Sequence, residues 1–171
     1  MRKRFVNLSV FMIFLIINSP YIINALTLGK NTLKGIRGIQ VVVENLNPDI
    51  EKDGLSQSTI QKDIEDKLSM AGIKVFSKDE TRSEPGRPYL YILIQSYKQK
   101  NMGIYAVAVR ISLKQLISLA RDPSIVSHDD TWKAIATIGF VGEKSVDSIR
   151  KVVQDHVDEF IKDFVSMNPG K

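Results

Sequence analysis

The chain has 171 residues, 43% of them hydrophobic and 25% charged, and it contains no cysteine. This length and composition are typical of one globular domain with a core of its own. The lack of cysteine excludes disulfides, thiolate metal sites, cysteine nucleophiles and the lipidated cysteine of a bacterial lipoprotein. The net charge of +5 does not indicate a nucleic-acid partner, because without Arg2, Lys3 and Arg4 the chain holds 21 basic and 19 acidic residues.

Residues 1–25 have the pattern of a secretory signal peptide. Three basic residues precede an apolar run over Phe5–Ile17, Pro20 interrupts it, and Ala25 is a small residue at the expected cleavage point. Two alternatives stay open: a buried core helix, and an uncleaved inner-membrane anchor over residues 5–23 that would allow transient membrane association. The apolar run is shorter than the ~20 residues that span a bilayer, so the pattern favours cleavage and a periplasmic or secreted protein.

The next residues predict a strand–helix–strand unit. A polar approach segment over residues 26–35 leads to a strand over residues 36–46, in which apolar residues alternate. Residues 50–57 are predicted to be a loop. Ser58 is predicted to open a helix, and residues 73–76 a short strand. The apolar stripe of this helix has helical spacing: Ile60, Ile64, Leu68 and Ala71.

The most hydrophobic stretch, Pro88–Leu119, predicts a β-hairpin with its turn at Gly103, preceded by a polar loop over residues 77–88. In the second strand, apolar residues alternate on the side expected to be buried: Tyr105, Val107, Val109, Ile111 and Leu113. The other side is wetter and holds Ala106, Ala108, Arg110, Ser112 and Lys114. A hairpin this apolar requires covering elements.

The rest of the chain predicts one more strand and one more helix. Residues 121–130 are expected to connect the hairpin to a single strand over residues 131–141. The inward side of this strand is predicted to hold Trp132, Ala134, Ala136, Ile138 and Phe140. Ser145 is predicted to cap the last helix. Its apolar stripe comprises Ile149, Val152, Val153, His156, Val157, Phe160, Ile161 and Phe164.

These elements predict an α+β fold with a single domain over residues 36–171. Both helices are expected on one face of a mixed, mostly antiparallel sheet of about five strands, which makes a two-layer sandwich.

The sequence contains no recognisable catalytic, cofactor or metal motif. The adjacent residues His128, Asp129 and Asp130 are of metal-ligand types, but neighbours on a loop seldom converge on one ion, so a solvated loop is favoured. The segment 142–145 lacks the glycine spacing of a phosphate-binding loop. His156 lies at the rim of an apolar stripe and is predicted to be packed. We therefore expect no cofactor and no enzymatic activity.

The wetter side of the hairpin is the candidate binding surface. Tyrosine and arginine are favoured at protein interfaces, and this region concentrates tyrosines and holds Arg110 beside small alanines. The predicted partner-binding residues are Tyr91, Tyr97, Lys98, Arg110 and Lys114. The alternative is an ordinary half-solvated sheet with tyrosines at its edges.

Several short motifs lie along the chain. They are Asp53-Gly54-Leu55, Leu68-x-x-Ala71-Gly72-Ile73-Lys74-Val75, Pro88-Tyr89-Leu90-Tyr91, Leu113-x-Gln115, Thr131-Trp132, Asp158-x-Phe160 and Asn168-Pro169. With these motifs, most of residues 36–170 resembles an uncharacterised family of small exported bacterial proteins, a likeness that implies export and no catalytic residues. More distantly, the order of elements resembles two periplasmic and outer-membrane accessory domains, the lipopolysaccharide-assembly lipoprotein and the N-terminal domain of the Tol propeller protein.

The sequence thus predicts an exported, non-enzymatic envelope protein, a protein-binding accessory domain whose partner is an unknown envelope protein. One alternative is a carrier that holds a small apolar ligand or lipid between the sheet and the helices. Another is an enzyme without a recognisable motif, which would need titratable groups converging in one cleft.

Overall fold

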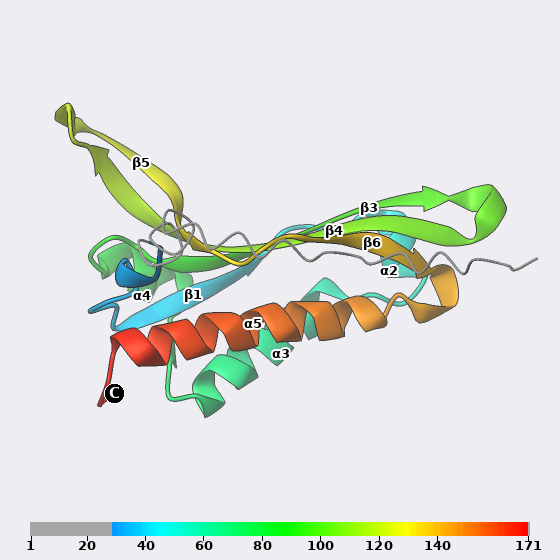
Figure 1. Ribbon diagram of the computed structural model, residues 1–171, viewed down its shortest axis with the longest axis horizontal. Coiled ribbons are helices and arrows are strands. Elements are labelled where there is room, and N and C mark those ends of the chain that lie inside the picture. The colour runs from blue at the N-terminus through cyan, green and yellow to red at the C-terminus, as the bar shows by residue number, and fades with distance from the viewer. Residues whose placement is uncertain (1–28, 171) are drawn as a thin grey trace, which may run out of the picture.

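The computed structural model of the protein describes residues 29–170, and the predicted signal peptide over residues 1–25 lies outside the described residues. The fold is α+β, with a mixed sheet of six strands (Figure 1). Strands β2, β1, β3, β4 and β5 lie in that order, and β6 also pairs with β4. Within residues 29–170, no helix has both the length and the apolar character that a membrane span requires.

The first part of the sheet is a parallel strand–helix–strand unit, as predicted. β1 (Gly38–Val43) pairs in parallel with β2 (Lys74–Val75) and with β3 (Tyr89–Gln99), and α3 (Gln57–Met70) connects β1 to β2. Alternate apolar residues of β1 are buried because one side of the strand faces α3. Gly72 follows α3 at a φ of +76°, a left-handed conformation that glycine adopts without steric cost and that ends the helix.

The predicted hairpin is also present. β3 pairs antiparallel with β4 (Ile104–Leu119), beginning with Tyr89 opposite Lys114. The turn consists of the 3-10 helix η1 (Lys100–Met102) and Gly103, which has a φ of +60°. The β4 residues predicted to face inward are all buried, which confirms the alternation: Tyr105, Val107, Val109, Ile111 and Leu113.

The other edge of β4 pairs with two strands. β5 (Asp122–Lys133) pairs with the C-terminal half of β4, and β6 (Thr137–Gly142) pairs with its N-terminal half before the short turn η2 (Glu143–Ser145). The predicted connection over residues 121–130 and the single strand over residues 131–141 are therefore wrong. β4 is long enough for a second hairpin, which extends from one end of the sheet (Figure 1).

The break between β5 and β6 contains one extra residue. Lys133 lies opposite Ser112, and four residues later Thr137 lies opposite Val109, only three residues away on β4. A bulge of one residue reverses the side to which all later side chains point. Of the residues predicted to face inward, the first two are buried and the last three are exposed: Trp132, Ala134, Ala136, Ile138 and Phe140.

Two short helices lie where loops were predicted. α2 (Pro48–Lys52) overlaps the predicted loop over residues 50–57 and buries Ile50. α4 (Lys78–Ser83) occupies half of the predicted loop over residues 77–88. Both are polar and short, and side-chain caps at their N-termini satisfy main-chain N–H groups that would otherwise lack partners.

α3 and α5 lie where the longer helices were predicted, with different first residues. α3 begins after Ser56, whose hydroxyl accepts a main-chain hydrogen bond in place of that of Ser58. α5 (Ser148–Met167) begins after Asp147, so its N-cap lies two residues beyond the predicted cap at Ser145. Five residues of the predicted stripe are fully enclosed: Ile149, Val153, Val157, Phe160 and Phe164.

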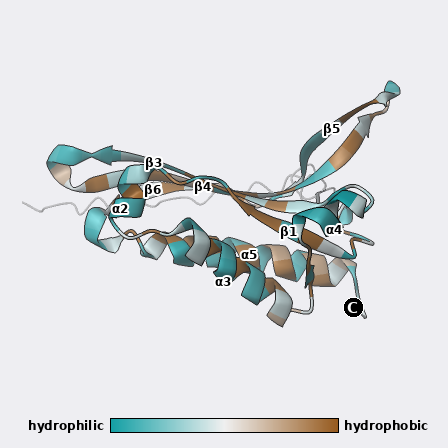
Figure 2. Cartoon of the chain, turned by 180° about the vertical axis from the view of Figure 1, so that it is seen from behind, coloured by the Kyte–Doolittle hydropathy of each residue, from teal (hydrophilic) through white to brown (hydrophobic). Residues whose placement is uncertain are grey.

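α3 and α5 lie side by side on one face of the sheet, which we call the inner face (Figure 1). Hydrophobic residues follow the strands and recur along α5 (Figure 2). The core between them includes Trp132 and Phe160, whose rings pack edge to face with centroids 5.0 Å apart. Leu33 is also fully buried, so the predicted polar approach segment contributes to the core.

The same substitution at two phenylalanines tests this assignment of the faces. Phe160→Ala should lower the free energy of unfolding by about 3–5 kcal/mol, because Phe160 is fully buried against Trp132. Phe140→Ala should change it by less than about 0.5 kcal/mol, because the Phe140 side chain is exposed. Urea unfolding followed by circular dichroism measures both. Equal losses at the two positions would contradict the reversal at the bulge.

Candidate binding surface

The side of the sheet opposite α3 and α5 is the outer face (Figure 1). Its side chains come from β3, β4 and β6, which are neighbours in the sheet. In register, Ala106 lies between Tyr97 and Phe140, and Ala108 lies beside Ile138. Cross-strand neighbours on one face contact each other, so these five residues form one continuous surface.

Large apolar side chains stand exposed on this outer face. Tyr97 is 72% exposed, and Ile138 and Phe140 are each 80% exposed. The alanines between them are too small to cover the aromatic rings, and none of the described elements shields them. A contiguous apolar patch that stays accessible is a mark of an interaction surface.

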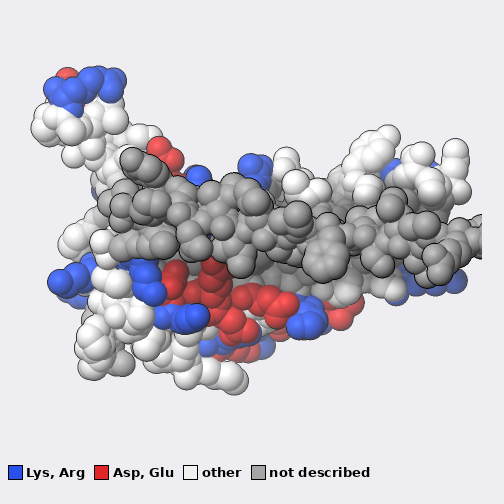
Figure 3. All heavy atoms as spheres, viewed as in Figure 1, with Lys and Arg blue, Asp and Glu red and all other residues white. Residues whose placement is uncertain are grey.

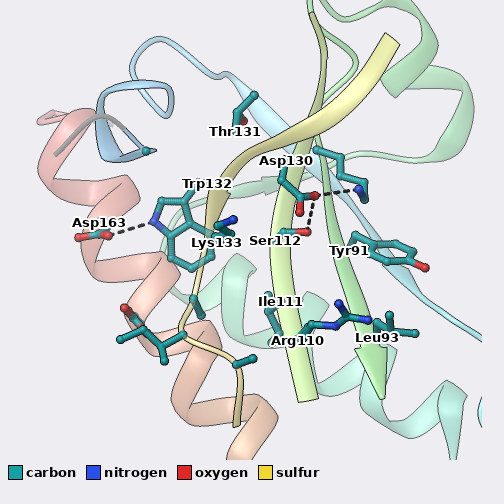
Figure 4. A pocket seen from close by; sticks show the side chains of 16 residues that line it. Tyr91, Leu93, Arg110, Ile111, Ser112, Asp130, Thr131, Trp132, Lys133 and Asp163 are labelled. Carbon is teal, nitrogen blue, oxygen red and sulfur yellow. Dashed lines mark hydrogen bonds and ion pairs between the residues drawn. The ribbon is translucent and has the colours of Figure 1, made fainter. Parts of the chain in front are cut away.

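A groove opens where β5 ends and β6 begins (Figure 4). Its volume is about 960 Å³. One side of the groove is the outer face, with Tyr91 and Arg110. The other side includes Trp132 of β5 and Asp163 of α5. The bulge at residues 134–136 creates the groove, because these residues do not continue the regular ladder alongside β4.

A polar cluster forms one wall of the groove (Figure 4). The Lys114 Nζ lies 2.7 Å from Asp130 Oδ1, and the Ser112 hydroxyl donates to the same oxygen at 2.9 Å. Burial would raise the pKa of Asp130, but the hydrogen bonds from Lys114 and Ser112 outweigh it and hold the pKa below its ordinary value of 3.8. The hydrogen bond to Asp130 raises the pKa of Lys114. Both groups are therefore charged at neutral pH.

The opposite wall is joined to α5 and to the first described residues. The Trp132 Nε1–H donates to Asp163 Oδ2 at 3.0 Å, and Lys30 Nζ lies 2.9 Å from Asp163 Oδ1. The Thr32 hydroxyl donates to the Thr131 carbonyl at 3.0 Å. Acidic side chains gather on the side of the molecule where α5 lies (Figure 3). The sheet side of the groove thus holds Arg110 and the Lys114–Asp130 ion pair, and the α5 side holds Glu159 and Asp163.

Four of the five predicted surface residues lie on the outer face: Tyr91, Tyr97, Arg110 and Lys114. The Tyr91 hydroxyl donates to Glu44 at 2.7 Å, and this hydrogen bond, together with burial, raises the pKa of Tyr91 to about 12. The Arg110 Nη2 donates to Gln95 Oε1 at 2.9 Å. That contact uses one of the five donors of the guanidinium, so the others can bind a carboxylate or carbonyl of a partner.

Lys98 lies on the inner face, because it is opposite Tyr105. Its Nζ is 2.6 Å from Asp53 Oδ2 and 3.1 Å from a Glu143 oxygen, and the buried Tyr105 hydroxyl also donates to Asp53 at 2.6 Å. The hydrogen bonds from Lys98 and Tyr105 lower the pKa of Asp53, and those to Asp53 and Glu143 raise the pKa of Lys98. Lys98 links the hairpin to its neighbours and does not join the outer face.

The exposed residues of β6 are the part of the surface that the sequence reasoning missed. Periodicity predicted Ile138 and Phe140 to be core, because they alternate in phase with Trp132. The adjacent residues Ala134, Ile135 and Ala136 hold no glycine or proline that would mark a bulge. One sequence signal could have indicated that Ile138 and Phe140 are exposed. The chain has more large apolar residues than the inner face has positions for them.

His128, Asp129 and Asp130 lie in β5 and not on the predicted solvated loop. The His128 ring packs against Tyr89 with centroids 5.6 Å apart, while the Asp130 carboxylate bonds Ser112. Among residues 29–170, no three potential ligand side chains cluster closely enough to hold a metal ion. His156 is half-buried and its Nε2 lies 2.9 Å from the Thr137 hydroxyl, a packed histidine as predicted.

Comparison of the chain with protein-family models and with curated protein sequences gives no match. The resemblance to small exported bacterial proteins therefore stays a prediction. The arrangement on the outer face offers an apolar patch, one arginine and a groove with charged walls, which are features suited to binding.

The charged wall of the groove gives a pH test. Asp130→Asn should be less stable to urea than the wild type at neutral pH, because it loses the charged acceptor of Lys114 and Ser112. The folded-state pKa of Asp130 lies below 3.8, so its contribution is present above pH 3.8 and is lost as the pH falls through the folded-state pKa. The difference between the urea midpoints should therefore shrink in acid. The exposed control Glu51→Gln should change the midpoint little at any pH, and a constant difference for Asp130→Asn would contradict the assignment.

Proposed function

We propose that this protein is an exported, non-enzymatic accessory domain of the bacterial envelope that binds another envelope protein through its outer face. In this proposal the fold works as a two-layer α+β sandwich, with the helices closing the inner face and the sheet presenting the outer one. The observation that carries the proposal is the exposed apolar patch of Tyr97, Ile138 and Phe140 beside Arg110. Aromatic residues and arginine supply much of the binding energy at protein interfaces.

The pKa directions of two lysines argue against catalytic roles for these two side chains. A lysine that acts as a base or nucleophile needs a lowered pKa. Lys98 and Lys114 both have raised pKa values, because each bonds a carboxylate: Asp53 and Glu143 for Lys98, and Asp130 for Lys114. Both clusters are therefore arranged as ion pairs that hold strands in place.

The chemistry of the surface indicates the kind of partner. An apolar side chain of the partner would fit beside Phe140 and Ile138, where the small Ala106 and Ala108 lie between larger neighbours. A carboxylate of the partner would pair with Arg110 at the edge of the groove. We infer a protein surface with an apolar centre and an acidic residue beside it.

A carrier of a small apolar ligand or lipid is the second candidate function. It is favoured by the groove, whose volume of about 960 Å³ is in the range of small-ligand sites, roughly 300–1,000 Å³. The groove lies at the sheet edge beside α5, and the space between sheet and helices is filled by core side chains. A carrier would therefore hold its ligand beside Trp132 at the edge, and quenching of the Trp132 fluorescence by a lipid with brominated acyl chains would detect it.

Affinity capture from bacterial envelopes tests whether the outer face binds an envelope protein. Wild-type protein should enrich a specific envelope protein, and Arg110→Glu combined with Tyr97→Ala should reduce that enrichment at least about tenfold, because both side chains are exposed on the outer face. The matched control combines Arg82→Glu and Met70→Ala, an exposed arginine and an exposed apolar residue elsewhere on the surface, and should enrich the same protein as the wild type. Equal enrichment by both double variants contradicts the proposed surface.

Export is tested by the N-terminal residue of the protein purified from bacterial cells. Intact-mass measurement should find a chain that begins at Leu26, because the pattern of residues 1–25 is that of a cleaved signal peptide. Retention of Met1 on material from the cytosol would contradict export. Retention of Met1 on material from the inner membrane would favour the anchor over residues 5–23.

A further inference from the structure

β6 is an edge strand whose far edge pairs with no other strand among residues 29–170. It pairs only with β4, and five of its six residues are exposed. The far edge of an edge strand carries unpaired main-chain N–H and C=O groups, which can pair with another chain. Such an edge is a binding site for an extended segment, independent of the side chains on the outer face.

The other edges of the sheet carry features that disfavour strand addition. The C-terminal half of β3, beyond its pairing with β1, includes Lys98, and the Asn47 side chain donates to its Ser96 carbonyl. β2 has only two residues, and one of them is Lys74. β5 carries charged residues and a proline along its exposed part, including Asp122, Pro123 and Asp129. β6 has the sequence Thr-Ile-Gly-Phe-Val-Gly, with no charge and no proline. It is the edge that lacks the features by which proteins avoid strand addition.

The register identifies the main-chain groups that point to this free edge. The Glu143 N–H donates to the Gly103 carbonyl at 2.9 Å, directly toward β4. Main-chain groups of successive residues in an antiparallel strand point alternately to its two edges. Val141 therefore points toward β4, and the main-chain groups of Ile138, Phe140 and Gly142 point to the free edge.

We propose that a second copy of this chain adds to this edge, with the two β6 strands antiparallel about a two-fold axis. The register that uses all three outward-pointing residues sets Phe140 opposite Phe140 of the partner and Ile138 opposite Gly142 of the partner. The large Ile138 then lies beside a glycine, and the strand brings no charge to repel its own copy. This self-complementarity is the reason to infer a second copy and not another protein.

The pairing joins two sheets into one and places both outer faces on the same side. The contact involves one short strand per copy, which is below the roughly 800 Å² per partner of a standard stable interface. The dimer should therefore form reversibly, with a dissociation constant in the micromolar range. This inference goes beyond the proposed function, because it concerns the main chain of β6 and does not depend on an envelope partner.

Gly142→Pro is the decisive variant. Gly142 has a φ of −69°, which proline adopts, and a Cβ added there would have no atom within 4 Å, so the fold should tolerate the change. The variant removes an N–H that points to the free edge and leaves the ladder to β4 intact. Gly142→Ala is the matched control, since it retains the N–H.

Sedimentation equilibrium of the untruncated protein, from 1 to 100 µM in roughly tenfold steps, measures the self-association. We expect a reversible dimer for the wild type and for Gly142→Ala, and a dissociation constant raised at least about tenfold for Gly142→Pro. A wild type that stays monomeric throughout overturns the proposal. Equal dissociation constants for Gly142→Pro and Gly142→Ala overturn it as well.

A charge exchange at the centre of the interface tests the register. Phe140→Lys and Phe140→Glu should each be monomeric, because like charges would lie opposite each other at the two-fold axis. Mixed together, they should form a heterodimer; a mixture that stays monomeric contradicts the Phe140–Phe140 register. Gly142→Pro leaves Arg110 and Tyr97 in place, so it should still enrich the envelope partner. Failure of the dimer proposal can therefore be told from failure of the proposed binding of an envelope protein.

Discussion

The pairing of both edges of β4 is the constraint on which the rest of the structure depends. β4 has sixteen residues, with β3 on one edge and β5 and β6 on the other. Its alternation fixes the inner face, because Tyr105, Val107 and the residues that follow in phase must be buried against the helices. Once that face is fixed, every side chain of β3 and β6 is assigned to one face by its register with β4.

The bulge between β5 and β6 is the point where this constraint has consequences for function. Trp132 anchors β5 to α5 through its ring contact with Phe160 and its hydrogen bond to Asp163. One extra residue later, the strand returns to β4 in the opposite phase, and Phe140 is turned outward. A protein could place polar residues at such positions at no cost to its core. The exposure of large apolar residues there is the observation on which the proposed binding role rests.

The long, strongly periodic elements could be predicted from the sequence, and the elements defined by a few contacts could not. The hairpin and the helix stripe from Ile149 to Phe164 repeat their pattern over several turns or pleats. α2 and α4 are five and six residues long and depend on caps, so they leave no periodic signal. The outward turn of Phe140 depends on its register with β4, and the periodicity of β6 alone carries no record of that register.

The outer face and the β6 edge share Phe140, because the bulge turns its side chain onto the outer face and its main-chain groups point to the free edge. A second copy at the edge would place Phe140 at the two-fold axis and the two Arg110 side chains on either side of it, on one shared outer face. A partner with repeated or symmetric acidic residues would then contact both copies, and two weak contacts held together bind far more tightly than either alone. Arg110 would then contact the partner directly. The main-chain N–H of Gly142 would contribute to the same binding by stabilising the dimer that brings the two Arg110 side chains onto one surface.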